Sequence, residues 1–265
     1  MYRFSAIFSI FVLLLTSCHD ERSQYGYVRL IFEHHWDGSP IKIDGTTQYR
    51  NAAGNILTFD NLEYLISDLT IAGIRVEHPL VHYINNDTAN SIMLLTYQFP
   101  TGNYNNISFT FGLNADQNIT NLHPNLSRMA WPVPMGGGYH YMMIDGKWSN
   151  EGETTNQGFG LHLGALERII RIDTIFGFSQ ISQQQDSIVR LDTFTHKFHI
   201  QFPVSVPRNF TIKQHEITTV QPIIMDVKQW MEGPFTWNFN VMGGSIMSRE
   251  RAMDSLASNG RSVFR

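Results

Sequence analysis

Residues 105–113 read Asn-Asn-Ile-Ser-Phe-Thr-Phe-Gly-Leu, with an apolar side chain at every second position. A period of two places these side chains on one face of a β-strand. Residues 25–33 (Tyr-Gly-Tyr-Val-Arg-Leu-Ile-Phe-Glu) alternate in the same way and lead into a turn at Asp37-Gly38. Residues 63–71 predict a long central strand with an irregular start.

Similar segments recur along the chain, separated by turn residues, and helix-forming segments are sparse. Such a pattern favours an all-β fold over alternating βα units. We expect an immunoglobulin- or jelly-roll-like antiparallel β-sandwich with irregular loops and a short C-terminal helix. That helix is predicted at residues 248–260, capped by Ser248 and ended by Asn259-Gly260. The further predicted strands are residues 139–144, 158–163, 169–175, 187–194, 195–206 and 205–220.

The N-terminus resembles a bacterial lipoprotein signal. Arg3 precedes an apolar run at residues 6–15, which is too short for a stable membrane span, and Cys18 lies where the acylated cysteine of such signals lies. The predicted division is a signal peptide at residues 1–17, a lipid-anchored tether at 18–24 and a single domain at 25–265, with an inserted hairpin at 165–195. This predicts an outer-membrane lipoprotein of the bacterial cell envelope, facing the periplasm or the cell surface and touching the membrane only through its anchor.

Charge and cysteine content limit the function. The net charge is −4 and becomes −5 when Arg3 leaves with the signal peptide, which argues against nucleic acid as a partner. Cys18 is the single cysteine of the 265 residues. A metal site in the mature chain must therefore use His, Met, carboxylate or a modified aromatic residue.

Catalytic motifs are not found in the sequence. The glycines at 136–138 lack the Lys-Ser/Thr and the helix that a phosphate-binding loop requires, and no Gly-x-Ser-x-Gly or His-Glu-x-x-His occurs. We therefore expect a binding protein and not an enzyme.

Residues 122–141 combine the side chains that suit copper with a restrained backbone. This stretch holds His123, Met129, Trp131, Met135 and His140, together with three prolines and three glycines. Imidazole and thioether are copper ligands, although Trp and Met are more often packing material. Among the 11 histidines, His34, His140 and His162 fall near strand ends or next to glycines that permit close approach of the backbone.

Several short motifs, in their order and spacing, make the mature chain resemble the MbnP family of bacterial copper-binding proteins. The resemblance covers nearly all of the mature chain except the insertion at 165–195. It rests on Phe32-Glu33-His34 with Asp37-Gly38, Tyr64 to Leu69, Phe111 to Asn114, Leu122-His123-Pro124, Met129-Ala130-Trp131, Gly138-Tyr139, Asp145-Gly146, Phe159 to Gly164, Ala252-Met253, Asn259-Gly260 and Val263-Phe264.

The resemblance implies a β-sandwich that holds one copper ion. In the family, and in the similar MopE and CorA proteins of methane oxidisers, histidines bind copper together with kynurenine made from tryptophan, and a di-haem enzyme related to cytochrome c peroxidases performs the oxidation in MbnP systems. Carried over, Trp131 is the residue to be oxidised, and His34 and His162 are the ligands. His140 and Met129 are second choices.

One position departs from the family. Its members often carry a second Trp two residues after the first, where this chain has Val133. If that second Trp is the one modified, the chain cannot make the cofactor. A Trp131 that is oxidised should lie close to the copper and be accessible to the oxidising partner.

The leading hypothesis is a lipid-anchored copper-binding protein for copper uptake, storage or handling. The alternative is a surface lipoprotein that binds glycan or a protein partner, without a metal, through exposed aromatic side chains. Trp36, Trp148, Trp230 and Trp237 are its candidate platforms.

Overall fold

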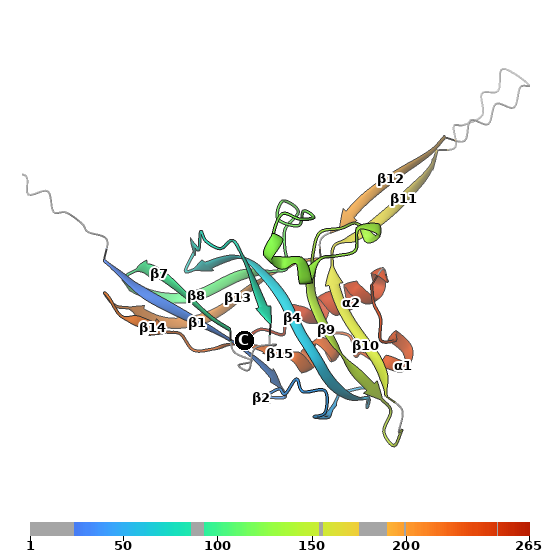
Figure 1. The fold of residues 1–265 in the computed structure, drawn as a ribbon, viewed down its shortest axis with the longest axis horizontal. Coiled ribbons are helices and arrows are strands. Elements are labelled where there is room, and N and C mark those ends of the chain that lie inside the picture. The colour runs from blue at the N-terminus through green and yellow to red at the C-terminus, as the bar shows by residue number, and fades with distance from the viewer. Residues whose placement is uncertain (1–23, 86–92, 154–155, 175–189, 199, 248) are drawn as a thin grey trace, which may run out of the picture.

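The computed structural model describes residues 24–85, 93–153, 156–174, 190–198, 200–247 and 249–265. Two β-sheets pack face to face, which confirms the predicted sandwich (Figure 1). In the described part of the chain, the smaller sheet consists of β1 (Tyr25–Trp36), β2 (Ser39–Pro40), β7 (Met93–Pro100), β14 (Ile217–Thr219) and β15 (Ile223–Asp226).

The larger sheet has the strand order β10-β9-β4-β8-β13, and three short strands pair with β4. Its long central strand is β4, as the sequence predicts. The strands are β3 (Tyr49–Arg50), β4 (Ile56–Ile71), β5 (Ile74–Arg75), β6 (Val81–Asn85), β8 (Gly102–Phe111), β9 (His140–Ser149), β10 (Gln157–Gly164) and β13 (Phe202–Ile212).

Most strand pairs are antiparallel, but β1 runs parallel to both β14 and β15. A separate two-stranded ladder, β11 (Leu166–Thr174) with β12 (Arg190–Phe198), extends from the end of β10 (Figure 1). This antiparallel ladder overlaps the segment predicted as an inserted hairpin, 165–195, and β12 continues three residues beyond it to Phe198.

The core lies between the two sheets and is rich in aromatic rings. Phe32 of β1 meets Phe109 of β8 edge to face at 5.8 Å, and Phe111 stacks on Phe202 at 4.8 Å. Each fully buried ring of this size contributes about 1.5–3 kcal/mol of hydrophobic stabilisation. The alternating apolar residues of the sequence therefore form the inner face of each sheet.

Short helices close one end of the sandwich: η3 (Val227–Met231), α1 (Phe239–Met242) and α2 (Glu250–Gly260). The predicted C-terminal helix is confirmed, but its caps differ from the prediction. Arg249 occupies the N-cap without a capping bond from its side chain, and Ser248 lies outside the described residues. The side chain of Asn259 is buried and bonds the backbone of Trp230 and Phe235, so this residue ties α2 to η3 and to the following loop.

A long loop covers the outer face of the larger sheet, which is the face turned away from the smaller sheet. This cap loop (residues 114–138) includes η1 (Pro124–Met129) and η2 (Val133–Met135), and Figure 1 shows it in green beside β4 and β9. Asn118 accepts the Tyr139 N–H at 2.7 Å, and Ala130 forms an antiparallel bridge with Tyr139. The cap loop is thus fixed at the start of β9. No helix of the described segments is long and apolar enough to cross a membrane.

Candidate metal-binding site under the cap loop

The strand register brings the candidate side chains together on the outer face of the larger sheet. His162 of β10 lies directly opposite Met143 of β9, which in turn lies opposite Glu63 of β4. Residues directly opposite one another in antiparallel strands project from the same face. His140, at the start of β9, has its ring centroid 5.2 Å from that of His162.

His140 is held in one tautomer by the cap loop. Its side chain is buried, and the Nδ1 atom lies 3.1 Å from the Met129 carbonyl oxygen. A carbonyl oxygen only accepts hydrogen bonds, so Nδ1 must carry the proton. Nε2 therefore holds the ring's lone pair, and among the described residues this buried atom has no hydrogen-bond partner.

His162 is oriented in a comparable way by a carboxylate. Its Nε2 lies 2.7 Å from Asp145 Oδ1, and the second oxygen of Asp145 accepts a hydrogen bond from the Asn61 amide at 3.0 Å. Burial acts to raise the pKa of Asp145, but the hydrogen bonds from His162 and Asn61 outweigh it and lower this pKa. An ionised Asp145 keeps the proton of His162 on Nε2 and leaves Nδ1 with the lone pair.

The charge state of His140 also suits a metal ligand. Burial, reinforced by the neighbouring His162, lowers the pKa of His140 to about 4. The ring is therefore neutral at physiological pH. Only the neutral imidazole binds metal ions.

Trp131 packs directly on this pair of histidines. Its ring centroid lies 4.7 Å from that of His140, and its Nε1–H donates to the Met135 carbonyl at 2.9 Å. A Cβ atom on Gly164 would lie 2.5 Å from the indole ring, so this glycine permits the close approach that the sequence predicted around His162. Trp131 is only 2 % exposed, and the expectation of an accessible tryptophan is wrong because the indole packs inward from the cap loop against His140 and Gly164.

Val133 lies two residues further along the same loop and differs sharply from Trp131. Its side chain is 71 % exposed, at the start of η2. Of the two positions, only 131 places a side chain against His140.

The cap loop is anchored to the sheet beside the histidines through an ion pair. The guanidinium of Arg128 bonds Glu63 Oε1 at 2.6 Å, and Tyr83 donates to the other oxygen of this fully buried carboxylate. Met129, the next residue, is also fully buried and supplies the carbonyl that His140 bonds. Asp145 and Glu63 were not predicted as site residues, because only the strand register places them beside His162 and Met143. Arg128 was not predicted either, because its ion pair with Glu63 depends on how the cap loop folds onto the sheet.

His34 does not lie in this group. Its Nε2 is 3.1 Å from the Tyr64 hydroxyl, in the core between the sheets. Tyr64 follows Glu63 on β4, and successive side chains of a strand point to opposite faces. His34 and His162 thus lie on opposite sides of the larger sheet. The structure does not bring them together as the two ligands of one site, which corrects the prediction.

Two other expectations concern the rest of the chain. Cys18, the predicted lipidation site, lies outside the described residues.

The four tryptophans proposed as exposed platforms are buried, which makes that prediction wrong: the exposed fractions are 8 % for Trp36, 5 % for Trp148, 0 % for Trp230 and 0 % for Trp237. They pack in or beside the aromatic core.

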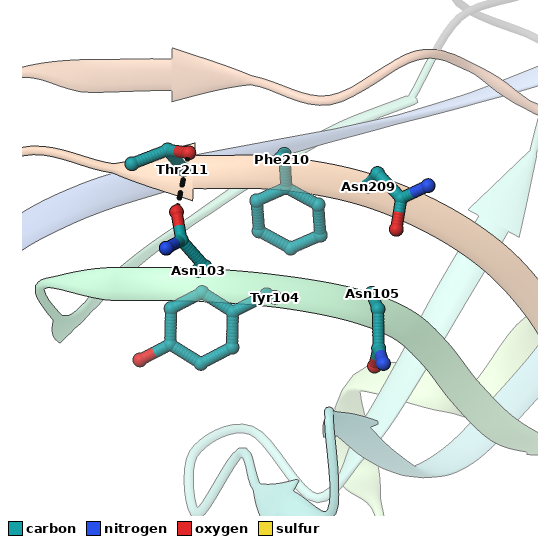
Figure 2. Close-up of a pocket in the computed structure, with 6 residues that line it drawn as sticks. All are labelled: Asn103, Tyr104, Asn105, Asn209, Phe210 and Thr211. Carbon is teal, nitrogen blue, oxygen red and sulfur yellow. Dashed lines mark hydrogen bonds between the residues drawn. The ribbon is translucent and has the colours of Figure 1, made fainter.

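A shallow surface pocket of about 470 Å³ lies between β8 and β13, and none of the predicted site residues lines it (Figure 2). Tyr104 and Phe210 stack there at 5.6 Å, and Thr211 donates to Asn103 across the two strands. The amide and aromatic lining offers no imidazole, thioether or carboxylate. This pocket does not suit a copper ion.

Within the described residues, no group of three or more His, Cys, Asp or Glu side chains is arranged to hold a metal ion. The imidazoles of His140 and His162 are each oriented by a hydrogen bond at one ring nitrogen. A metal ion bound to the other two ring nitrogens would therefore need a further ligand that is not His, Cys, Asp or Glu. The buried, partnerless Nε2 of His140 fits a ligand role, because a buried polar atom without a hydrogen bond is unusual in a stable protein.

The fold and this site define a β-sandwich protein with a capped pair of histidines. The MbnP family model matches residues 25–248, and the chain belongs to the MbnP family. No curated protein matches the chain. Among solved structures, MbnP from Methylosinus trichosporium is similar, with a TM-score of 0.47, 12 % sequence identity and coverage of 79 % of this chain and 78 % of that chain.

Proposed function

We propose that the chain binds one copper ion between His140 and His162, beneath the cap loop. The observation that carries the proposal is that these two imidazoles lie side by side, each with one nitrogen bonded to a fixed acceptor. Metal-binding histidines usually donate their other N–H to a carbonyl or carboxylate, which orients the ring and raises its basicity. Met129 and Asp145 provide these two acceptors.

Membership of the MbnP family supports copper as the metal, and the donor types agree with it. Imidazole binds both oxidation states of copper, and nearby thioether sulfur favours Cu(I). The proposed role is copper uptake, storage or handling, so the ion is cargo and the protein is not an enzyme.

We further propose that Trp131 is the residue converted to kynurenine. Its ring lies against His140, so the amine and carbonyl of kynurenine would form next to the proposed ligands. An indole has only an N–H donor and no free lone pair for a metal. The catalyst in this proposal is a di-haem enzyme related to cytochrome c peroxidases, and the oxidant is peroxide. Two oxygen atoms add as the indole C2–C3 bond breaks, and hydrolysis then releases the formyl group as formate, which leaves kynurenine. Because Trp131 is buried, direct contact between this enzyme and the indole needs the cap loop to open.

The proposed location follows from the N-terminal sequence. Acylation of Cys18 would hold the domain at the outer membrane, facing the periplasm or the cell surface. A Cys18→Ser variant should remain unacylated and appear in the soluble fraction of the cell envelope. Membrane retention of that variant would refute the anchor.

The test is the copper content of the full chain purified from its native host. We expect about one copper per chain in the wild type, and a sharp fall in a His140→Asn, His162→Asn double variant. The control is His215→Asn, because His215 is exposed and has a positive φ of 60°, which Asn tolerates. A wild type without copper, or a double variant that keeps it, would refute the proposal.

A Trp131→Phe variant tests the modification separately. We expect the intact mass of the wild type to differ from the sequence value by the change from tryptophan to kynurenine, and the variant to lack that difference. An unmodified Trp131 in copper-loaded protein would refute the kynurenine proposal and leave the histidine site in place.

A further inference from the structure

The outer face carries a buried thioether next to His162 that the sequence did not single out. Met143 of β9 is the direct cross-strand partner of His162, and its side chain is only 8 % exposed. Opposite pairs in antiparallel strands have Cβ atoms about 4.5–5.5 Å apart. A methionine has three rotatable bonds, so its sulfur can reach a metal held by the neighbouring imidazole.

The carboxylates beside Met143 are already committed to other groups. One oxygen of Asp145 accepts from His162 and the other from Asn61. Glu63, the second cross-strand neighbour of Met143, bonds Arg128 through one oxygen and Tyr83 through the other. Both carboxylates thus already orient or neutralise other groups, whereas the Met143 sulfur has no strong hydrogen bond that would compete with a metal.

We propose that Met143 is the third donor of the site and that it makes the site selective for Cu(I). This inference rests on the proposed copper site and specifies its ligand set as His140 Nε2, His162 Nδ1 and Met143 Sδ. All three donors are neutral. Kynurenine formed from Trp131 would add a further neutral donor, so the site has no anionic ligand to favour Cu(II), and thioether sulfur is a soft donor that prefers Cu(I).

Burial strengthens this preference. His140 is 6 % exposed, Met143 is 8 % exposed and the His162 side chain is 20 % exposed, so a bound ion loses part of its hydration. The cost of placing charge in a poorly hydrated site rises steeply with that charge. With neutral ligands, a singly charged Cu(I) is retained at a lower cost than a doubly charged Cu(II).

The experiment compares Met143→Leu with Met142→Leu in the full chain. Both methionines lie on β9, but Met142 is the cross-strand neighbour of Tyr64 on the core side of the sheet. A Met-to-Leu exchange conserves volume and generally costs less than about 1.5 kcal/mol, so both variants should fold. Affinities for Cu(I) and Cu(II) are measured separately by competition with chelators, under reducing and oxidising conditions.

We expect Met143→Leu to lower the Cu(I) affinity at least about tenfold, which corresponds to 1.4 kcal/mol, and to leave the Cu(II) affinity nearly unchanged. Met142→Leu should change neither. X-ray absorption of the Cu(I) protein should show a sulfur neighbour that Met143→Leu removes. Labelled methionine methyl groups give a second readout, since the Met143 signal should move on addition of Cu(I).

The outcomes separate the two proposals. Copper that is bound through histidines with no sulfur neighbour, and with equal affinities in wild type and Met143→Leu, overturns the role of Met143 alone. A wild-type chain that binds neither Cu(I) nor Cu(II) overturns the proposed function, and this inference with it.

Discussion

His34 and His140 are both buried histidines, yet they lie on opposite sides of the larger sheet and differ in their surroundings. His34 projects into the aromatic core and meets the Tyr64 hydroxyl, whose pKa burial raises well above its ordinary value. His140 lies under the cap loop, bonds a backbone carbonyl and touches a second imidazole.

This difference separates a histidine that completes the core from one that is a ligand in the proposed copper site. Tyr64 stays protonated, and its hydroxyl shares a hydrogen bond with Nε2 of His34, which gives a partner to two polar groups that would be costly to bury alone. On the outer face, the acceptors instead fix the protons of His140 and His162 and leave lone pairs directed elsewhere. Burial alone therefore does not mark a ligand; the partner of the other ring nitrogen does.

The largest expected effect comes from His34→Ala. The substitution leaves a cavity in the core and a Tyr64 hydroxyl without its partner, so we expect the free energy of unfolding to fall by about 2–4 kcal/mol. Copper content should stay near that of the wild type, since His34 lies across the sheet from the proposed site. Chemical denaturation and metal analysis of the same preparation measure both quantities. A variant that is stable but has lost its copper would show that His34 acts in copper binding and not in the core.

Much of the fold follows from the sequence because inner-face residues alternate. The apolar residues Ile107, Phe109 and Phe111 form the inner face of β8. Gly164, two residues after His162, permits the close approach that the sequence predicted, here to the Trp131 ring. The parallel pairing of β1 with β14 and β15 could not be predicted, because strands that are distant in sequence carry no local signal for their direction.

The site was predicted only in part. Trp131, Met129, His140 and His162 do lie together, since the short segment between Trp131 and His140 keeps the cap loop close to β9. The face on which His34 projects depends on how the two sheets are stacked. The roles of Asp145 and Met143 depend on the register between β9 and β10, which includes a bulge after Leu163. Neither the stacking of the two sheets nor the register between two strands can be predicted from the sequence of one strand.

A second, smaller effect is expected from Gly164→Ala, which tests how closely the outer face is packed. The added Cβ would lie 2.5 Å from the Trp131 ring, and overpacking of this kind generally costs about 1–3 kcal/mol. The indole must shift from its present position against His140, so copper affinity should fall together with stability. Gly158→Ala is the matched control on the same strand, because its Cβ would meet no atom within 4 Å. Equal stability and copper binding in the two variants would show that the packing of Trp131 on Gly164 does not matter.

The smallest expected effect is the pH dependence of the stability of the metal-free protein. It compares His140 with His82, a histidine that lies between the sheets. Burial lowers the pKa of His82, which bonds Tyr97 of β7, to about 4, close to the value for His140. Both pKa values lie below the ordinary value of about 6.5 that applies in the unfolded chain. The unfolded state therefore binds more protons between pH 6.5 and pH 4, and the free energy of unfolding should decrease as the pH falls through this window.

Each histidine should contribute about 1–2 kcal/mol to this decrease between pH 7 and pH 5. The groups facing His140 are His162, Asp145 and the carbonyls of Met129 and Ala130. Urea denaturation at several pH values should give a shallower slope for His140→Asn and for His82→Asn than for the wild type. Copper should distinguish the two sites. An ion on the lone pair of His140 opposes protonation of the folded state, so in the His82→Asn variant saturation with Cu(I) should extend the decrease in the free energy of unfolding to pH values below about 4, where it levels off in the metal-free protein. Cu(I) should leave the pH dependence of His140→Asn nearly unchanged. The same response to Cu(I) in both variants would mean that His140 is not a ligand, and the distinction between the two kinds of buried histidine would fail.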